Sequence, residues 1–271
     1  MHCARKFSYG ILFDIIFLIS VLIFYFYFAC DHLARQGIYC DVGLLGNKAM
    51  GIYKNVHFEG ADFINLFHKS IPLMLLDYHG PVEIYLFLPA LYIFGNTAFA
   101  LHIVPVLFGG LTIIVFYILT FLFYRNRWIA AALNLLLASL PTFIAAIRVG
   151  FYTGTLLMFF SIAATLCFLL WMRKKLFFWL IIAVFFLGLG MGSRCNFWWF
   201  PVALLIFSCL FYKEPLHRIN ALKMREKLAC LFMVSLGIFP IILSNLLGRF
   251  HTIKFFLKHL IISNDGISNL N

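Results

Sequence analysis

Charged residues are scarce in this chain, and acidic residues are scarcest of all. Asp, Glu, Lys and Arg together make up 11% of the 271 residues, and only ten of them are acidic. Hydrophobic residues account for 64%, and the mean hydropathy is +0.99. A water-soluble globular domain carries about a quarter of its residues as charges. The composition therefore excludes a soluble domain and predicts an all-α, polytopic, integral membrane protein.

Several other patterns are missing, and each absence excludes a class of protein. The seven cysteines form no CxxC pair and no Cys/His metal spacing, which argues against a zinc site and a disulfide framework. The net charge of +11 is spread over short Lys/Arg clusters between apolar runs, so we expect no nucleic acid partner. Acidic residues at mid-membrane depth and paired interrupted helices are also absent, which disfavours a transporter.

Long apolar runs are what the sequence does have. A membrane-spanning helix needs about 20 apolar residues. We expect about seven transmembrane helices within a domain of residues 1–247, followed by an external C-terminal tail, 248–271. The predicted spans are 10–30, 98–123, 128–147, 151–172, 176–193, 196–212 and 228–247.

The short apolar stretch 81–94 decides the topology. If it does not span, most of the 21 Lys and Arg residues lie on the cytoplasmic side, and if it does, most lie outside. Cytoplasmic loops carry the excess of positive charge. We therefore predict a juxtamembrane helix at 81–94, an external loop at 31–97 and a cytoplasmic N-terminus in a plasma (inner) membrane.

The polar stretch 31–83 contains six of the ten acidic residues, and Asp41 is its first candidate for chemistry. Asp41 follows the first predicted span and precedes a second possible juxtamembrane helix, 42–49. A carboxylate held just above the bilayer can accept a proton from a hydroxyl group or bind a divalent cation. The alternative is an exposed loop aspartate.

The sequence Asp-Tyr-His-Gly-Pro-Val-Glu at 77–83 is a second candidate. It brings Tyr78, His79 and Glu83 to the start of the predicted helix 81–94, with Pro81 near its first position. A helix N-terminus favours an anion such as a phosphate. The alternative is a helix start in which Asp77 and Glu83 only balance the helix dipole.

Two isolated arginines, Arg148 and Arg194, interrupt apolar sequence at the predicted outer ends of the third and fifth spans. The guanidinium group suits phosphate oxygens, so a lipid phosphate is a natural partner. The alternative is that both side chains extend to the membrane surface without binding a specific ligand.

In order along residues 10–212, these features resemble the N-terminal half of GT-C glycosyltransferases of the protein O-mannosyltransferase and aminoarabinose transferase type. The resemblance is carried by Asp41 in the first external loop and by the segments Tyr78-His79-Gly80-Pro81, 85–95 (YLFLPALYIFG) and 98–105 (AFALHIVP).

The resemblance implies inverting transfer of a sugar from a polyprenyl-phosphate carrier to a lipid, glycan or protein acceptor on the outer face. Asp41 then takes the position of the catalytic acid, His79 that of the helix-start motif, and Arg148 and Arg194 lie near the carrier phosphate. Tyr78 and Glu83 complete the expected substrate-binding set. The resemblance leaves the cofactor unknown, with a divalent cation as one option.

Three positions depart from the pattern of that family. Val42 stands where a Glu is frequent, Thr153 where some members have an Asp, and His102 where an Arg is typical. The family also continues through further spans. An inactive truncated fragment or a lipid-binding membrane module without turnover is therefore the alternative function.

Overall fold

The computed structural model describes residues 2–35, 37–56, 62–66, 69–75, 79–151, 154–210, 214–248, 250 and 254, without the side chains of 2–9 and of Asp41. The chain forms two compact units. Unit 1 comprises Met1–Gly43 and Pro89–Phe186, and unit 2 comprises Leu44–Leu88 and Leu187–Asn271.

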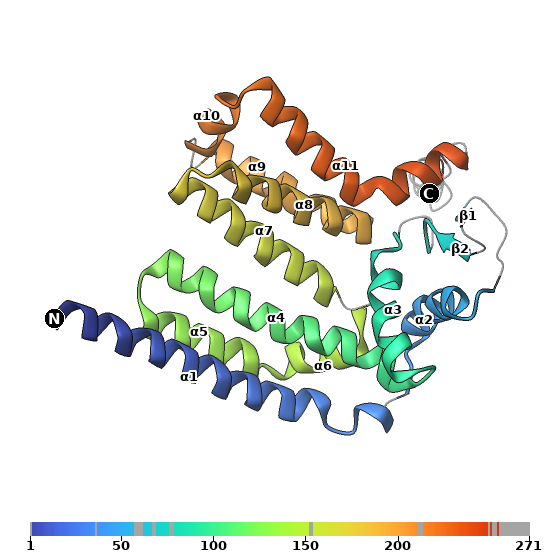
Figure 1. Ribbon diagram of the computed structural model, residues 1–271, viewed down its shortest axis with the longest axis horizontal. Coiled ribbons are helices and arrows are strands. Elements are labelled where there is room, and N and C mark those ends of the chain that lie inside the picture. Colours follow the sequence, from blue (N-terminus) through green and yellow to red (C-terminus); the bar gives the residue numbers. More distant parts are fainter. Residues whose placement is uncertain are drawn as a thin grey trace, which may run out of the picture. The chain divides into compact units, whose positions relative to one another are not determined.

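Helices make up nearly all of the described chain (Figure 1), which confirms the predicted all-α polytopic membrane protein. In chain order the elements are α1 (His2–Cys30), η1 (Leu33–Arg35), α2 (Cys40–Tyr53), β1 (Phe63–Leu66), β2 (Lys69–Pro72), α3 (Val82–Phe94), α4 (Ala98–Tyr124), α5 (Arg127–Ser139), α6 (Pro141–Val149), α7 (Thr155–Lys174), α8 (Phe177–Ser193), η3 (Cys195–Trp198), α9 (Trp199–Leu210), α10 (Glu214–Asn220) and α11 (Met224–Leu247).

Four helical segments in the described residues are long and apolar enough to cross a membrane, or up to six if each of two bent pairs is one span. The uninterrupted ones are Gly10–Arg35, α4, α7 and α11. Each of the seven predicted spans coincides with a helix or a helix pair. The difference from seven arises because 128–147 is bent, Cys195–Leu210 meets the criteria only together with α10, and α8 has only 17 residues.

Helices occur at both positions where the sequence predicts juxtamembrane helices, as α2 and α3. With 13 residues, α3 is too short to span a bilayer without help. The predicted fold lacked the antiparallel β1–β2 hairpin, in which Phe63 pairs with Pro72. Strands of four residues are too short to show a clear alternating pattern.

In unit 1, α4 packs against α1, α5, α6 and α7 (Figure 1). The fully buried Tyr25 of α1 donates a hydrogen bond to the Val106 carbonyl of α4 at 2.9 Å. Gly109 makes this approach possible, because a Cβ atom there would lie 2.1 Å from the Tyr25 hydroxyl. Small residues allow membrane helices to pack closely in this way.

Local sequence signals set several helix ends in unit 1. Thr97 caps α4 by accepting a hydrogen bond from the Ala100 amide, and Asn126 caps α5 through the amides of Trp128 and Ile129. Pro141 occupies the first turn of α6, where its missing N–H costs nothing. The α5–α6 axis bends by 53° at this point, which is why span 128–147 is not one straight helix.

Candidate active site

Among the charged residues of unit 2 that the structure describes, Glu83, in the first turn of α3, is the most buried. Its side chain is 0% exposed. Its Oε2 atom lies 3.1 Å from His79 Nε2, and its Oε1 atom lies 3.5 Å from Arg194 Nε. Ser193 Oγ donates a hydrogen bond to the same Oε1 at 3.0 Å. Three of the predicted site residues, His79, Glu83 and Arg194, therefore meet in one ion cluster.

Backbone contacts explain why the two segments of this cluster meet. The Gly80 amide donates to the Ser193 carbonyl at 2.8 Å, and His79 and Arg194 form an isolated antiparallel bridge. A Cβ atom on Gly80 would lie 1.8 Å from the Gly192 carbonyl oxygen. Only glycine at residue 80 permits this approach. His79 lies three residues before α3, and the bridge to Arg194 places it beside Glu83 in the first turn of that helix.

Glycines also bring α8 and α11 together next to the cluster. A Cβ atom on Gly192 would lie 2.2 Å from the Gly237 carbonyl oxygen, and one on Gly188 would lie 2.7 Å from that of Val234. Gly188 and Gly192 have the Gly-x-x-x-Gly spacing that allows close helix packing in membranes. Ser193 and Arg194 therefore project from a backbone that two helices hold in place.

Burial controls the electrostatics of the cluster. The side chains of His79 and Arg194 are only 5% and 11% exposed. Taking charges out of water is costly, and each charge here is compensated by its neighbours. His79 Nδ1 also lies 3.2 Å from the Gly80 carbonyl oxygen. A neutral imidazole can donate to only one of its two oxygen neighbours, and an imidazolium can donate to both.

Lys48 is a half-buried charge near this site, and the sequence did not single it out. Its Nζ atom donates to the carbonyl oxygens of Met74 and Leu75 at 2.9 and 3.0 Å and lies 4.9 Å from the centre of the Phe63 ring. Burial lowers the pKa of Lys48 from its ordinary value, and the neighbouring Asp62 carboxylate partly opposes that shift. Lysine in a polar segment is normally exposed, so no sequence signal distinguished it.

The other predicted site residues are Asp41, Tyr78 and Arg148. Asp41 is the second residue of α2, but its side chain is outside the described set, and so is all of Tyr78. Arg148 belongs to unit 1, where its Nη2 atom donates to the Asp31 carbonyl at 2.7 Å. His102 Nδ1 in turn donates to the Arg148 carbonyl at 3.0 Å. Arg148 thus ties the segment after α1 to the end of α6.

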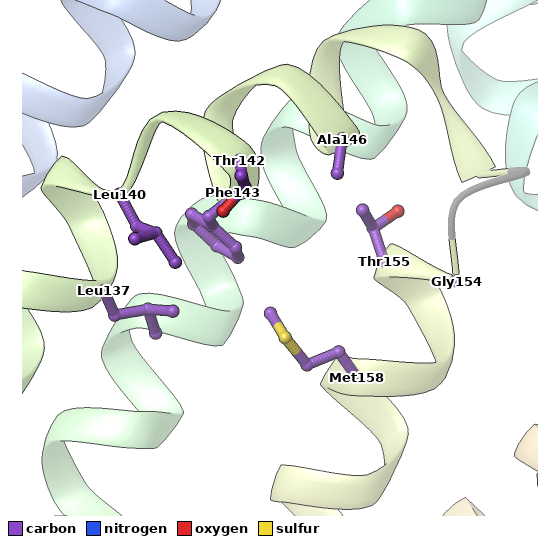
Figure 2. A pocket seen from close by; sticks show the side chains of 8 residues that line it. All are labelled: Leu137, Leu140, Thr142, Phe143, Ala146, Gly154, Thr155 and Met158. Atoms are coloured by element: carbon purple, nitrogen blue, oxygen red, sulfur yellow. The ribbon is translucent and has the colours of Figure 1, made fainter.

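Unit 1 also has an apolar cavity of about 240 Å³ at the α5–α6 bend (Figure 2). None of the described residues that line it is charged. Its lining residues are Leu137, Leu140, Thr142, Phe143, Ala146, Gly154, Thr155 and Met158. This cavity offers no acid, base or phosphate ligand of its own.

A metal ion needs several ligands in one place. No group of three or more His, Cys, Asp or Glu side chains with suitable positions occurs among the residues that the structure describes. The side chain of Asp41 and all of Glu59 and Asp77 lie outside the described residues. The sequence-based option of a divalent cation therefore remains a prediction.

The helices and the buried ion cluster define a multi-pass integral membrane protein with a polar site at the start of a short helix. The family model described as dolichyl-phosphate-mannose-protein mannosyltransferase matches residues 78–243, and the chain belongs to this family. The protein is thus a glycosyltransferase of the GT-C type, as the resemblance predicted. No curated protein and no solved structure matches the chain.

Proposed function

We propose that this protein transfers a sugar from a polyprenyl-phosphate-linked donor to an acceptor on the outer face of the membrane, with inversion at the anomeric carbon. The observation that carries the proposal is the buried cluster of His79, Glu83 and Arg194. It lies within the segment that matches the glycosyltransferase family. Arginine and histidine next to a helix start are suited to a phosphate group.

The reaction needs one base and a stabilised leaving group. Asp41 accepts the proton of the acceptor hydroxyl, and the hydroxyl oxygen attacks the anomeric carbon. The bond from that carbon to the phosphate oxygen breaks, and the polyprenyl phosphate leaves with the electron pair. Because the leaving group is a phosphate, catalysis consists mainly of orienting the reactants and stabilising charge.

The remaining site residues have proposed roles in binding the donor phosphate, in orienting the substrates or in holding other side chains in place. Arg194 binds the phosphate of the donor through its guanidinium group, and Arg148 is a second phosphate ligand. His79 and Tyr78 orient the donor or the acceptor. Because Glu83 is fully buried, it acts by holding His79 and Arg194 in place and does not contact substrate.

The proposed acceptor is a lipid, glycan or protein, and the proposed location is the plasma (inner) membrane with a cytoplasmic N-terminus. Cys40 tests this topology, because it is an exposed free cysteine at the start of α2. A membrane-impermeant maleimide added to intact cells should label the wild-type protein more than Cys40→Ser. Equal labelling of the two would contradict an external position for residues 31–97.

The catalytic test uses the full chain in proteoliposomes with a panel of radiolabelled polyprenyl-phosphate sugars and a membrane extract as the source of acceptors. Asp41→Asn should lower transfer at least about 100-fold, because the general base is lost. Arg194→Lys should lower it about 10-fold or more, because the guanidinium fork is lost. Asp31→Asn is the control, since this carboxylate is 58% exposed and, among the described residues, pairs with the exposed His32.

Two outcomes would contradict the proposal in different ways. Full transfer by Asp41→Asn would remove the role given to Asp41. Binding of donor without transfer by the wild-type protein, with every sugar and extract, would favour the lipid-binding module without turnover.

A further inference from the structure

Lys48 contacts the backbone just ahead of His79. Its Nζ atom donates hydrogen bonds to two consecutive carbonyl groups, those of Met74 and Leu75. The amide of the same Leu75 donates to the His79 carbonyl at 2.8 Å. Lys48 of α2 is therefore linked to the backbone of His79 through one residue, Leu75, which is hydrogen-bonded to both.

The surroundings of Lys48 hold the ammonium group in one position. It lies over the Phe63 ring of β1 at 4.9 Å, a distance suited to a cation–π interaction. The hairpin is closed beside it, because the Leu73 amide donates to the Asp62 carbonyl at 2.6 Å. The segment 73–75 is thus held between the hairpin and α2, and Lys48 is the side chain that bonds to its carbonyls.

We propose that Lys48 is a positioning residue for glycosyl transfer, which acts by fixing the backbone of Met74 and Leu75 so that His79 is presented to Glu83 and Arg194. This inference rests on the proposed function of that cluster. Lys48 itself touches neither donor nor acceptor. Misplacement of a site residue by about 1 Å can cost on the order of 100-fold in rate, so a remote hydrogen bond of this kind has a measurable effect.

The critical substitution is Lys48→Met, which keeps an unbranched apolar chain and removes all three donors, leaving the two carbonyls without this partner. Lys48→Arg keeps a cation and several donors. Lys54→Met is the matched control, because it makes the same change in charge at an exposed lysine just after α2.

Two measurements on folded protein test the proposal. In Lys48→Met we expect kcat/KM for the lipid-linked donor to fall about 10- to 100-fold per folded molecule, with recovery of most of it in Lys48→Arg and no loss in Lys54→Met. We also expect faster hydrogen exchange at the Leu75 amide in Lys48→Met. If that variant does not fold, Lys48→Gln, which keeps a shorter donor, should show the same two effects more weakly.

The results separate this inference from the proposed function. A purely structural role for Lys48 would lower the yield of folded protein but leave kcat/KM per folded molecule and the exchange of Leu75 unchanged, which would overturn the inference. If Asp41→Asn abolishes transfer while Lys48→Met transfers normally, only the role of Lys48 fails. If the wild-type chain transfers no sugar, the proposed function fails. Faster exchange at the Leu75 amide in Lys48→Met would then still report on the contact between Lys48 and this backbone segment.

Discussion

An ion pair in unit 1 and the ion cluster around Glu83 in unit 2 differ in how far they are exposed. In unit 1, Asp14 accepts a hydrogen bond from Tyr117 at 2.7 Å and lies 3.3 Å from Arg127, with 20% of the Asp14 side chain and 36% of the Arg127 side chain exposed. In unit 2, Glu83 and its ionic partners are at most 11% exposed. The Asp14–Arg127 pair of unit 1 thus stays partly exposed, whereas in unit 2 Glu83 and its ionic partners are removed from solvent.

This difference indicates where the protein uses charge for more than orientation in the membrane. A partly exposed ion pair at a helix end costs little to form and contributes little. A buried one carries a desolvation cost that the attraction between its members barely offsets, so it is weak evidence for stability. The cluster in unit 2 is therefore better explained by a need to hold His79 and Arg194 in fixed positions.

Glu83→Gln should cause the largest loss of stability. It leaves Arg194 and His79 buried without their counter-charge, so we expect the free energy of unfolding to fall by about 3–5 kcal/mol. The loss is measured by titration of the detergent-solubilised protein with SDS. A change below about 1 kcal/mol would mean that the cluster is more solvated than its burial indicates. The Glu83 cluster would then not differ in solvation from the Asp14–Arg127 pair.

Gly192→Ala tests the backbone that supports the cluster. The new Cβ atom would lie 2.2 Å from the Gly237 carbonyl oxygen, and neither backbone can give way easily. We expect a loss of about 1–3 kcal/mol in the same titration, together with lower transfer activity. Gly37→Ala in unit 1 is the control, because nothing lies within 4 Å of a Cβ atom there. Equal stability of the two variants would argue against the close α8–α11 contact.

Much of this arrangement could be predicted from the sequence, and the parts that could not have physical reasons. Gly-Pro before an apolar run placed the start of α3, and with it His79 and Glu83 beside that start. Arg194 stood out as a charge in apolar sequence. Their meeting could not be predicted, because Glu83 and Ser193 are 110 residues apart and helical periodicity says nothing about distant partners.

Other features left a signal that the prediction did not use. Pro141 within span 128–147 indicates a bend, and the Gly188–Gly192 spacing indicates a close helix contact. Lys48 left none, since its burial depends on a hairpin that the sequence did not reveal. The site is therefore least predictable where it depends on contacts between short elements.

Asp14→Asn is the counterpart of Glu83→Gln in unit 1 and should have a much smaller effect. Asparagine keeps an oxygen that can accept the Tyr117 hydrogen bond, and Arg127 is exposed enough to be solvated without its partner. We expect a loss of about 0.5–1 kcal/mol by SDS titration. A loss as large as that of Glu83→Gln would show that both units depend equally on their ion pairs.

The smallest predicted effect is a pH dependence of stability from Lys48 in unit 2. Burial lowers the pKa of Lys48 below its value of 10.5 in the unfolded chain, so between the two values the unfolded state binds more protons than the folded state. Stability from this group should therefore rise with pH in that window, with a slope below about 1.4 kcal/mol per pH unit.

Tyr85 has the opposite effect at higher pH, because burial raises its pKa from 10.0 to about 12, and the folded state then keeps a proton that the unfolded state loses. The comparison is therefore made below pH 10, between the wild-type protein, Lys48→Met and the exposed Lys54→Met. We expect the positive slope to disappear in Lys48→Met alone. The same slope of stability against pH in all three proteins would show that Lys48 is as solvated as Lys54. Unit 2 would then bury its ion cluster but not this lysine.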